Sequence, residues 1–233
     1  PGEEPAPDAM LRYEQLIEDS APVPDARRAD ADLACIMYTG GTTGFPKGVM
    51  QTHPNLWCGS LQRMAEIPPL RQSMLLHSAP LFHVGALSRA MMQFLGGGTH
   101  VIVPAFEAGE LLQTIERERI NELALVPTMI QSLIAHPDFA RTDLSSVRRL
   151  SYGASPILAT VLGDMMVALA GVDFFHQYGL TEACPIVSVN PPANHGDEGR
   201  ASGLSGSAGR AVPGVEVKIV DGEGRELPPR SVG

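Results

Sequence analysis

Residues 122–135, ELALVPTMIQSLIA, form a short apolar run that leads into a proline and then a helical pattern, and this combination decides the fold class. The run at 122–126 has the length and composition of a buried strand. Pro127 follows at a position where a helix can begin, because the first helical turn leaves its N–H groups unpaired. The stretch therefore predicts one β-strand followed by one α-helix.

The same unit recurs along the chain at a spacing of roughly 25 residues, which is typical of repeated βαβ units around a parallel sheet. The strand-like runs lie at residues 74–79, 99–103, 122–126, 149–152 and 172–175. Apolar residues at helical spacing fill three of the stretches between them, at 109–120, 127–135 and 156–170. We therefore predict an α/β fold in which a parallel βαβ sheet is layered with helices.

The two ends of the chain differ from this repeated core. Residues 1–32 are rich in Pro, Ala, Asp and Glu, and we expect a lead-in segment with one short helix at 10–17. Residues 33–200 are expected to form the main domain. Residues 201–233 begin with many small residues, and the stretch 215–220 then alternates at period two, as a half-buried strand does. We predict that a β-rich module starts there.

Composition excludes several classes of protein. Of the 233 residues, 44% are hydrophobic and 18% are charged, which indicates a globular chain with a real core. The net charge of −9 argues against a nucleic-acid or anionic-membrane partner, because both need a basic face. No apolar run approaches the ~20 residues of a membrane helix, and no secretory signal is recognisable. We therefore expect a cytoplasmic protein.

The three cysteines, Cys35, Cys58 and Cys184, lie far apart in the sequence. Their spacing matches neither a zinc site nor a disulfide framework. Unpaired cysteines of this kind behave as small hydrophobic residues. We expect all three to lie in or near the core of a protein from a reducing compartment.

The densest functional signal is the loop YTGGTTGFPKG at residues 38–48. Its glycines let backbone N–H groups converge, and such a nest binds anions. It is not a Walker loop, because Pro46 precedes Lys47 and Gly48 follows it. We predict a polyphosphate site on a loop that joins two strands, and a glycine-rich hairpin without a ligand is the alternative. The assigned residues are Thr39, Gly40, Gly41, Thr42, Thr43, Gly44 and Lys47.

A second motif, HQYGLTE at residues 176–182, follows the last strand of the parallel series. Ligands of open α/β sheets bind beyond the carboxyl ends of the strands. Tyr178 offers a flat ring to a base, and Thr181 can donate a hydrogen bond to a phosphate. Glu182 can bind Mg²⁺, which prefers carboxylate oxygen. On this motif alone, an ordinary strand-end loop remains the alternative.

Two further turns follow strands on the same side of the predicted sheet. Gly153-Ala154-Ser155-Pro156 is a turn of small residues that lets a flat ring lie against the backbone. By itself it is equally a plain connection between a strand and a helix. The stretch PLFHVG at 80–85 places His83 at a strand end, although a single histidine is more often structural than catalytic.

The motifs at 39–48 and 176–182 resemble those of the adenylate-forming superfamily, which includes acyl-CoA synthetases, aryl-CoA ligases, luciferases and peptide-synthetase adenylation domains. Gly40 stands where the phosphate loop of that family usually has serine. The Tyr-Gly-x-Thr-Glu motif matches at every fixed position. The resemblance implies that Tyr178 packs on adenine, that Thr181 contacts the α-phosphate and that Glu182 binds magnesium.

The resemblance also assigns neighbouring residues. It implies an adenine pocket that is lined by Gly153, Ala154, Ser155, His176, Gln177, Tyr178 and Gly179. Residues 82–85 resemble a segment that borders the acyl pocket of the family, although Gly85 comes one residue early, and this implies a substrate pocket at His83, Val84 and Gly85. Residues 206–214 resemble the opening of the β-barrel subdomain of the family, so that 201–233 is expected to be the start of a small β-barrel subdomain.

The function implied by the resemblance is that of an ATP-dependent acyl-CoA synthetase. It would activate a carboxylate as an acyl-adenylate and then transfer the acyl group to coenzyme A, with Mg²⁺ at Glu182 and with Thr181, Glu182 and Lys47 as catalytic residues. The residues around His83 and at 176–182 resemble most those of fatty-acyl-CoA ligases, and this resemblance implies a fatty acid as the substrate. The alternatives are an acyl-AMP ligase, an aryl-CoA ligase or a nucleotide-binding fragment without turnover.

The resemblance covers about residues 30–233. The ribose-binding Asp, the hinge and the catalytic lysine of the family would follow residue 233. We therefore expect an incomplete fragment that is inactive alone and that associates with itself through unpaired strand edges.

Overall fold

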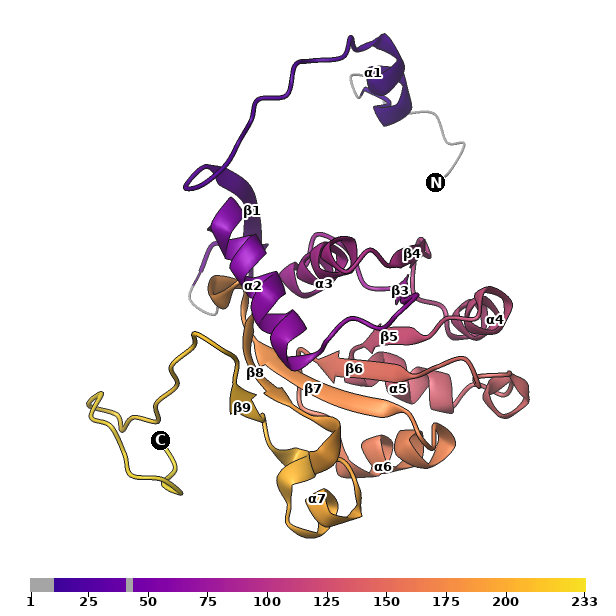
Figure 1. The fold of residues 1–233 in the computed structure, drawn as a ribbon, viewed down its shortest axis with the longest axis vertical. Helices are drawn as coiled ribbons and strands as arrows, with labels where there is room; N and C mark the ends of the chain where they lie inside the picture. Colours follow the sequence, from indigo (N-terminus) through magenta and orange to yellow (C-terminus); the bar gives the residue numbers. More distant parts are fainter. Residues whose placement is uncertain (1–10, 41–43) are drawn as a thin grey trace.

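The computed structural model describes residues 11–40 and 44–233 (Figure 1). Its centre is a seven-stranded sheet with the order β4-β3-β5-β6-β7-β8-β9. The strands from β4 to β7 pair in parallel, whereas β8 and β9 pair antiparallel at one edge. Their bounds are β3 Met74–His77, β4 Thr99–Ile102, β5 Glu122–Leu125, β6 Arg149–Gly153, β7 Asp173–Gly179, β8 Ile186–Asn190 and β9 Arg210–Ala211. The predicted α/β class is confirmed.

One face of the sheet is covered by α4 (Ala108–Glu118), α5 (Pro127–Ile134) and α6 (Ala159–Ala168). Each helix contributes buried apolar residues to the main core, such as Leu111 in α4 and Met165 in α6. The predicted helices at 109–120, 127–135 and 156–170 correspond to these three. The helices α2 (His53–Glu66) and α3 (Val84–Leu95) pack against each other. Figure 1 shows α2 in front of the sheet, with α5 and α6 behind it.

The strand order changes direction at β3. The chain passes from β3 outward to β4 and then returns across β3 to β5, so that β3 lies between the other two. Because parallel crossovers are right-handed, α3 and α4 must lie on opposite faces of the sheet. Such a change of direction leaves a crevice beyond the carboxyl ends of the central strands, where open α/β sheets bind their ligands. The strand order alone therefore predicts where a ligand site would lie.

A separate antiparallel hairpin consists of β1 (Leu33–Thr39) and β2 (Lys47–Thr52). Its register pairs Thr39 with Lys47, so the glycine-rich loop joins two strands as predicted. Gly41, Thr42 and Thr43, which were assigned to the phosphate site, lie outside the described residues. α2 begins directly after β2 because Thr52 and Asn55 form a reciprocal capping box at its N-terminus.

Short helical elements complete the chain. The N-terminal helix α1 (Tyr13–Asp19) has no buried side chain. The remaining elements are η1 Phe139–Arg141, η2 Thr181–Ala183, η3 Pro192–Asn194, α7 Asp197–Ala201 and η4 Leu204–Gly206. Among the residues that the structure describes, no helix is both long enough and apolar enough to cross a bilayer.

Two details of the sequence prediction are wrong. Residues 215–220 do not form a strand, and only Val220 pairs with Glu226 across a turn. The apolar side chains of Val217 and Ile219 are half exposed, because no neighbouring strand of the described chain covers them. Cys58 is exposed rather than near the core, since it lies on the outer face of α2. The barrel subdomain and the domain boundaries stay predictions.

Candidate active site

A cavity of about 500 Å³ opens at the carboxyl ends of β3, β5, β6 and β7. This is the position that the change of direction at β3 dictates. The loop after β3 forms one wall and the ends of β6 and β7 form another. The residues that line it mix apolar surface with a small number of polar groups, as ligand pockets do.

The cavity gathers most of the residues predicted for the adenine and acid sites. They are His83, Val84, Gly85, Gly153, Ala154, Gln177, Tyr178, Gly179 and Thr181. Ser155, His176 and Glu182 are adjacent in sequence to these lining residues but do not line the cavity themselves. Thr39, Gly40, Gly44 and Lys47 lie on the separate hairpin. The structure thus brings together two of the predicted turns and the strand-end motif, while the roles of the individual residues stay predictions.

The backbone at the ends of β6 and β7 requires glycine at two points. A Cβ atom at Gly153 would lie 2.1 Å from the carbonyl oxygen of Gln177, and one at Gly179 would lie 1.7 Å from that of Pro185. The β7–β8 register shifts between Tyr178 and Gly179, so the strand bends at the motif. The backbone segments next to Gly153 and Gly179 therefore pack closely against their neighbours. The ring of Tyr178 is half exposed and lines the cavity.

Ala154 adopts a left-handed conformation with φ of 68° at the turn after β6. A non-glycine residue in this region is strained, and strain of this kind gathers at functional sites. Ala154 also lines the cavity. The adenine role of this turn stays a prediction, and the plain strand–helix connection remains its alternative.

Gln51 ties the hairpin to the strand-end motif. Its Nε2 donates a hydrogen bond to the carbonyl oxygen of Thr181 at 2.9 Å, and the Sγ of Cys35 approaches its Oε1 at 3.7 Å. Gln51 is 2% exposed, so this contact is shielded from water. The end of β2 that leads into α2 is thereby held beside Thr181. Sequence analysis missed Gln51, although an inward-facing polar residue in an alternating strand is a usable signal.

Glu182 lies in the 3₁₀ turn η2, and its side chain is exposed. Within the part of the chain that the structure describes, its carboxylate has neither a hydrogen bond nor an ion pair. A free carboxylate of this kind fits a Mg²⁺ ion, which takes one or two protein carboxylates together with substrate phosphates. Residues 11–40 and 44–233 contain no group of three His, Cys, Asp or Glu side chains that could hold a metal alone.

Tyr152 is fixed at the cavity wall by a buried hydrogen bond. Its hydroxyl lies 2.8 Å from Nε2 of His195, whose Nδ1 lies 2.9 Å from the carbonyl oxygen of Pro191. Because a carbonyl can only accept, Nδ1 carries the proton and Nε2 accepts from the tyrosine hydroxyl. Burial lowers the pKa of His195, which disfavours the charged form of the ring. His195 thus holds the Tyr152 hydroxyl in place through its neutral Nε2.

Two histidines stack beside the cavity. Nε2 of His77 lies 3.0 Å from Nδ1 of His100, with the rings nearly parallel at 5.0 Å. Burial lowers the pKa of His77 to about 4, helped by His100 and Arg89. His77 is therefore neutral at physiological pH, because a proton there would lie in a desolvated and positively charged surrounding.

Sequence analysis also missed two arginines that line the cavity, Arg63 of α2 and Arg89 of α3. Both are buried, with 4% and 5% of their surface exposed. Arg89 is the only charged residue of α3, and this isolated charge was the available signal.

Comparisons with known proteins agree on one family. The sequence matches the family model described as AMP-binding enzyme over residues 3–233. Feruloyl-CoA synthase of an Amycolatopsis species is 36% identical over 203 residues, which are 87% of this chain and 40% of that enzyme. The indoleacetate–CoA ligase of Aromatoleum aromaticum is 33% identical over an alignment of 233 positions, which covers 97% of this chain and 44% of that ligase.

A solved structure shows the same arrangement. O-succinylbenzoate coenzyme A synthetase of Bacillus subtilis, in complex with AMP, superposes with a TM-score of 0.79 at 27% sequence identity. The match covers 94% of this chain and 54% of the synthetase. The chain spans less than half the length of the two curated relatives.

Proposed function

Because this chain belongs to the family of AMP-binding enzymes, we propose that the full-length protein is an ATP-dependent ligase that joins a carboxylic acid to coenzyme A through an acyl-adenylate. The observation that supports this most is the single cavity that the turn after β6, the motif after β7 and the loop after β3 share. A nucleotide and an acid would meet there. The ligase relatives, which act on different acids, agree with this reaction class.

In this proposal, the carboxylate oxygen of the acid attacks the α-phosphorus of ATP, and the bond to pyrophosphate breaks. The thiol of coenzyme A then attacks the acyl carbon, and AMP leaves. Tyr178 and the turn at Gly153 and Ala154 would hold adenine, while Thr181 would donate to the α-phosphate. Lys47 and the loop amides would stabilise negative charge on the phosphates. Mg²⁺ at Glu182 would neutralise further charge there.

The acid would lie along the loop after β3, beside His83, Val84 and Gly85. We propose an acid with a hydrocarbon body, which includes the fatty acids that the sequence favours and the aryl acids named for relatives. An acyl-AMP ligase is the second candidate, because it shares the first half-reaction and lacks the transfer to coenzyme A. The two differ in whether a thioester forms when coenzyme A is added.

The test uses the full-length protein with ATP, Mg²⁺ and a panel of fatty and aryl acids. We expect acid-dependent pyrophosphate release and, with coenzyme A, a thioester. Glu182→Gln should lower pyrophosphate exchange by about 100-fold or more, since loss of one group that stabilises developing charge has this effect. Glu110→Gln is the control, because Glu110 is exposed on α4, outside the cavity lining. Wild-type exchange in Glu182→Gln, or no release with any acid, contradicts the proposal.

A further inference from the structure

The described residues bury more positive than negative charge. The buried charged side chains are three arginines, Arg63, Arg89 and Arg149, and one carboxylate, Glu122. A buried charge is costly unless it is paired and hydrogen-bonded. One carboxylate cannot pair with three guanidinium groups, so the layer between the sheet and the helices α2 and α3 has an unbalanced positive charge.

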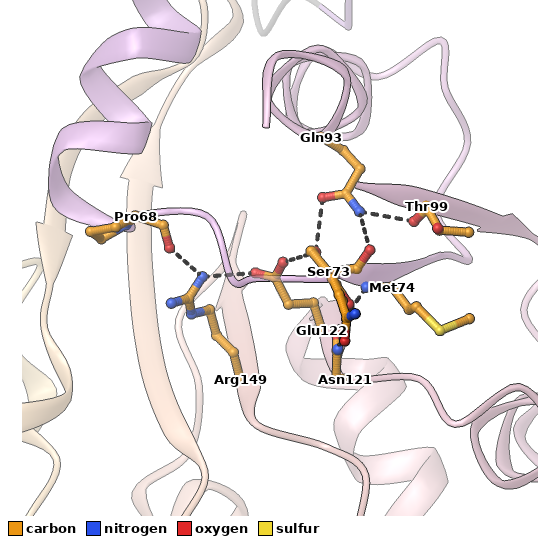
Figure 2. Close-up of polar contacts among 9 residues, drawn as sticks. Pro68, Ser73, Met74, Gln93, Thr99, Asn121, Glu122 and Arg149 are labelled. Atoms are coloured by element: carbon orange, nitrogen blue, oxygen red, sulfur yellow. Dashed lines mark hydrogen bonds and ion pairs between the residues drawn. The ribbon is translucent and has the colours of Figure 1, made fainter. Parts of the chain in front are cut away.

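The only carboxylate of this buried set already has partners. Figure 2 shows Glu122 beside Arg149 and Ser73. Nη1 of Arg149 lies 3.0 Å from Oε1 of Glu122 and donates a second hydrogen bond to the carbonyl oxygen of Pro68 at 2.9 Å. Gln93 completes the network through Ser73. Glu122 forms its ion pair with Arg149 and also attracts Arg89, but neither Arg63 nor Arg89 has an ion pair of its own among the described residues.

Arg63 and Arg89 both line the cavity, and the guanidinium group of each has a buried donor without a partner among the described residues. Arg63 donates from Nη1 to Ser88 at 2.9 Å, but its buried Nε has no partner. The buried Nη1 of Arg89 also has no partner among the described residues. Burial lowers the pKa of Arg63 to about 9 and that of Arg89 to about 10, so both stay charged at neutral pH.

Other polar groups without partners line the same cavity. The hydroxyls of Ser78 and Ser151 and the amide Nε2 of Gln177 are buried and make no hydrogen bond within the described chain. Each can donate a hydrogen bond. A cavity wall with several unused donors and two cations is matched to a ligand that presents oxygen atoms and negative charge.

Arg89 belongs to the side of the cavity that is assigned to the acid. It follows Gly85 by four residues on α3, so the two lie on one helix face and about 6 Å apart along the axis. The predicted nucleotide residues come instead from β6, β7 and the hairpin. An anion at Arg89 is therefore best supplied by the far end of the acid substrate.

We propose that Arg63 and Arg89 bind a second carboxylate of the acid substrate, so that the enzyme activates one end of a dicarboxylic acid while the guanidinium groups hold the other. This assignment rests on the proposed function. The activated carboxylate reacts as described above, and the bound carboxylate keeps its charge throughout. Acids with a neutral hydrocarbon end would leave both guanidinium groups without an ion pair.

The experiment compares matched acids with the full-length protein: hexanoic against adipic acid, and cinnamic against 4-carboxycinnamic acid. Pyrophosphate release gives kcat/KM for each. We expect each diacid to exceed its partner by about tenfold to a hundredfold, the size of one charge-assisted hydrogen bond. Arg89→Met should abolish or reverse this preference and leave the KM for ATP unchanged. Arg89→Lys, which keeps the charge, should retain part of it.

Two controls keep the result interpretable. Arg141→Met removes an exposed arginine outside the cavity lining and should change neither selectivity nor stability. The thermal unfolding midpoint of each variant shows whether it folds. Addition of adipate without ATP should raise the midpoint of the wild type but not that of Arg89→Met, which reports binding independently of catalysis.

The outcomes separate the two proposals. Equal rates for diacids and monoacids, with no change in Arg89→Met, overturn the dicarboxylate assignment and leave the ligase function standing. A raised KM for ATP in Arg89→Met with unchanged acid selectivity overturns it in favour of the nucleotide phosphates. Stabilisation by adipate without any pyrophosphate release supports the anion site and overturns the ligase reaction.

Discussion

Replacement of Glu122 by glutamine should destabilise the fold more than replacement of Glu122 and Arg149 together. Glu122 is fully buried and Arg149 is 6% exposed, with 3.0 Å between the paired atoms. Breaking a buried pair leaves one charge without a partner and costs about 3–5 kcal/mol, whereas replacing both members by apolar residues is often neutral. Glu122→Gln also removes the attraction between Glu122 and Arg89, which raises the cost of breaking the pair toward the upper end of that range.

Arg149 has contacts that limit this cost. Its guanidinium donates to the carbonyl oxygen of Pro68 and lies over the ring of Phe175 at 5.3 Å. A cation over an aromatic ring is worth roughly 0.5–2 kcal/mol. Glu122→Gln also keeps a side-chain oxygen that can accept a hydrogen bond. We therefore expect about 3 kcal/mol for Glu122→Gln and a much smaller cost for the double variant Glu122→Gln/Arg149→Met.

The assay is urea unfolding of the full-length protein, followed by circular dichroism, with both single variants and the double variant. The two single costs should sum to well above the cost of the double variant, because the carboxylate and the guanidinium depend on each other. Asp143→Asn is the control, since it breaks a pair with Arg119 in which both side chains are about half exposed. It should move the unfolding midpoint far less. If Glu122→Gln unfolds at the same urea concentration as Asp143→Asn, the charge accounting is wrong.

Two further predictions concern the cavity wall. Tyr152→Phe removes the donor to Nε2 of His195 and leaves a buried acceptor unpaired, which should cost about 1–3 kcal/mol of unfolding free energy. The control Tyr13→Phe changes an exposed residue and should cost nothing measurable. Equal unfolding midpoints for the two variants would refute the assigned hydrogen bond. His77 has a pKa of about 4 in the folded protein, below its ordinary 6.5, so the unfolded chain binds more protons between these values. The contribution of His77 to stability should therefore be fully present above pH 6.5 and fall toward pH 4. His77→Gln should flatten that part of the curve of unfolding midpoint against pH. An unchanged slope in this variant would show that other groups control the pH dependence.

The sequence predicted the parallel sheet because each strand–helix unit is recognisable from its own residues. The apolar run at 122–126 and the proline after it need no distant partner to be identified. The strand expected at 215–220 failed for the opposite reason, since a half-buried strand depends on a neighbour that periodicity does not reveal. The family resemblance was equally local, because it rested on two short motifs, and the family match confirms it.

The residues of the candidate site likewise differ in whether the sequence alone could identify them. Strand-end motifs such as Gly153-Ala154 and Tyr178-Gly179 were found because the carboxyl ends of parallel strands meet at one edge. Arg63 and Arg89 were not, because an arginine in a helix usually faces water. Only the packing of α2 against α3 shows that both are buried at the cavity. The two arginines on which the proposed acid preference rests therefore could not be found from motifs alone.

The hydrogen bond from Gln51 to Thr181 sets an order of events during synthesis. The two residues are separated by 130 positions. At about 5–20 residues per second, translation needs roughly 6 to 26 seconds to pass from one to the other. During that interval the β1–β2 hairpin has left the ribosome without the strand-end loop that anchors it, whereas β3 and β4 can already pair. The β1–β2 hairpin is therefore synthesised well before the strand-end loop that anchors it through Gln51.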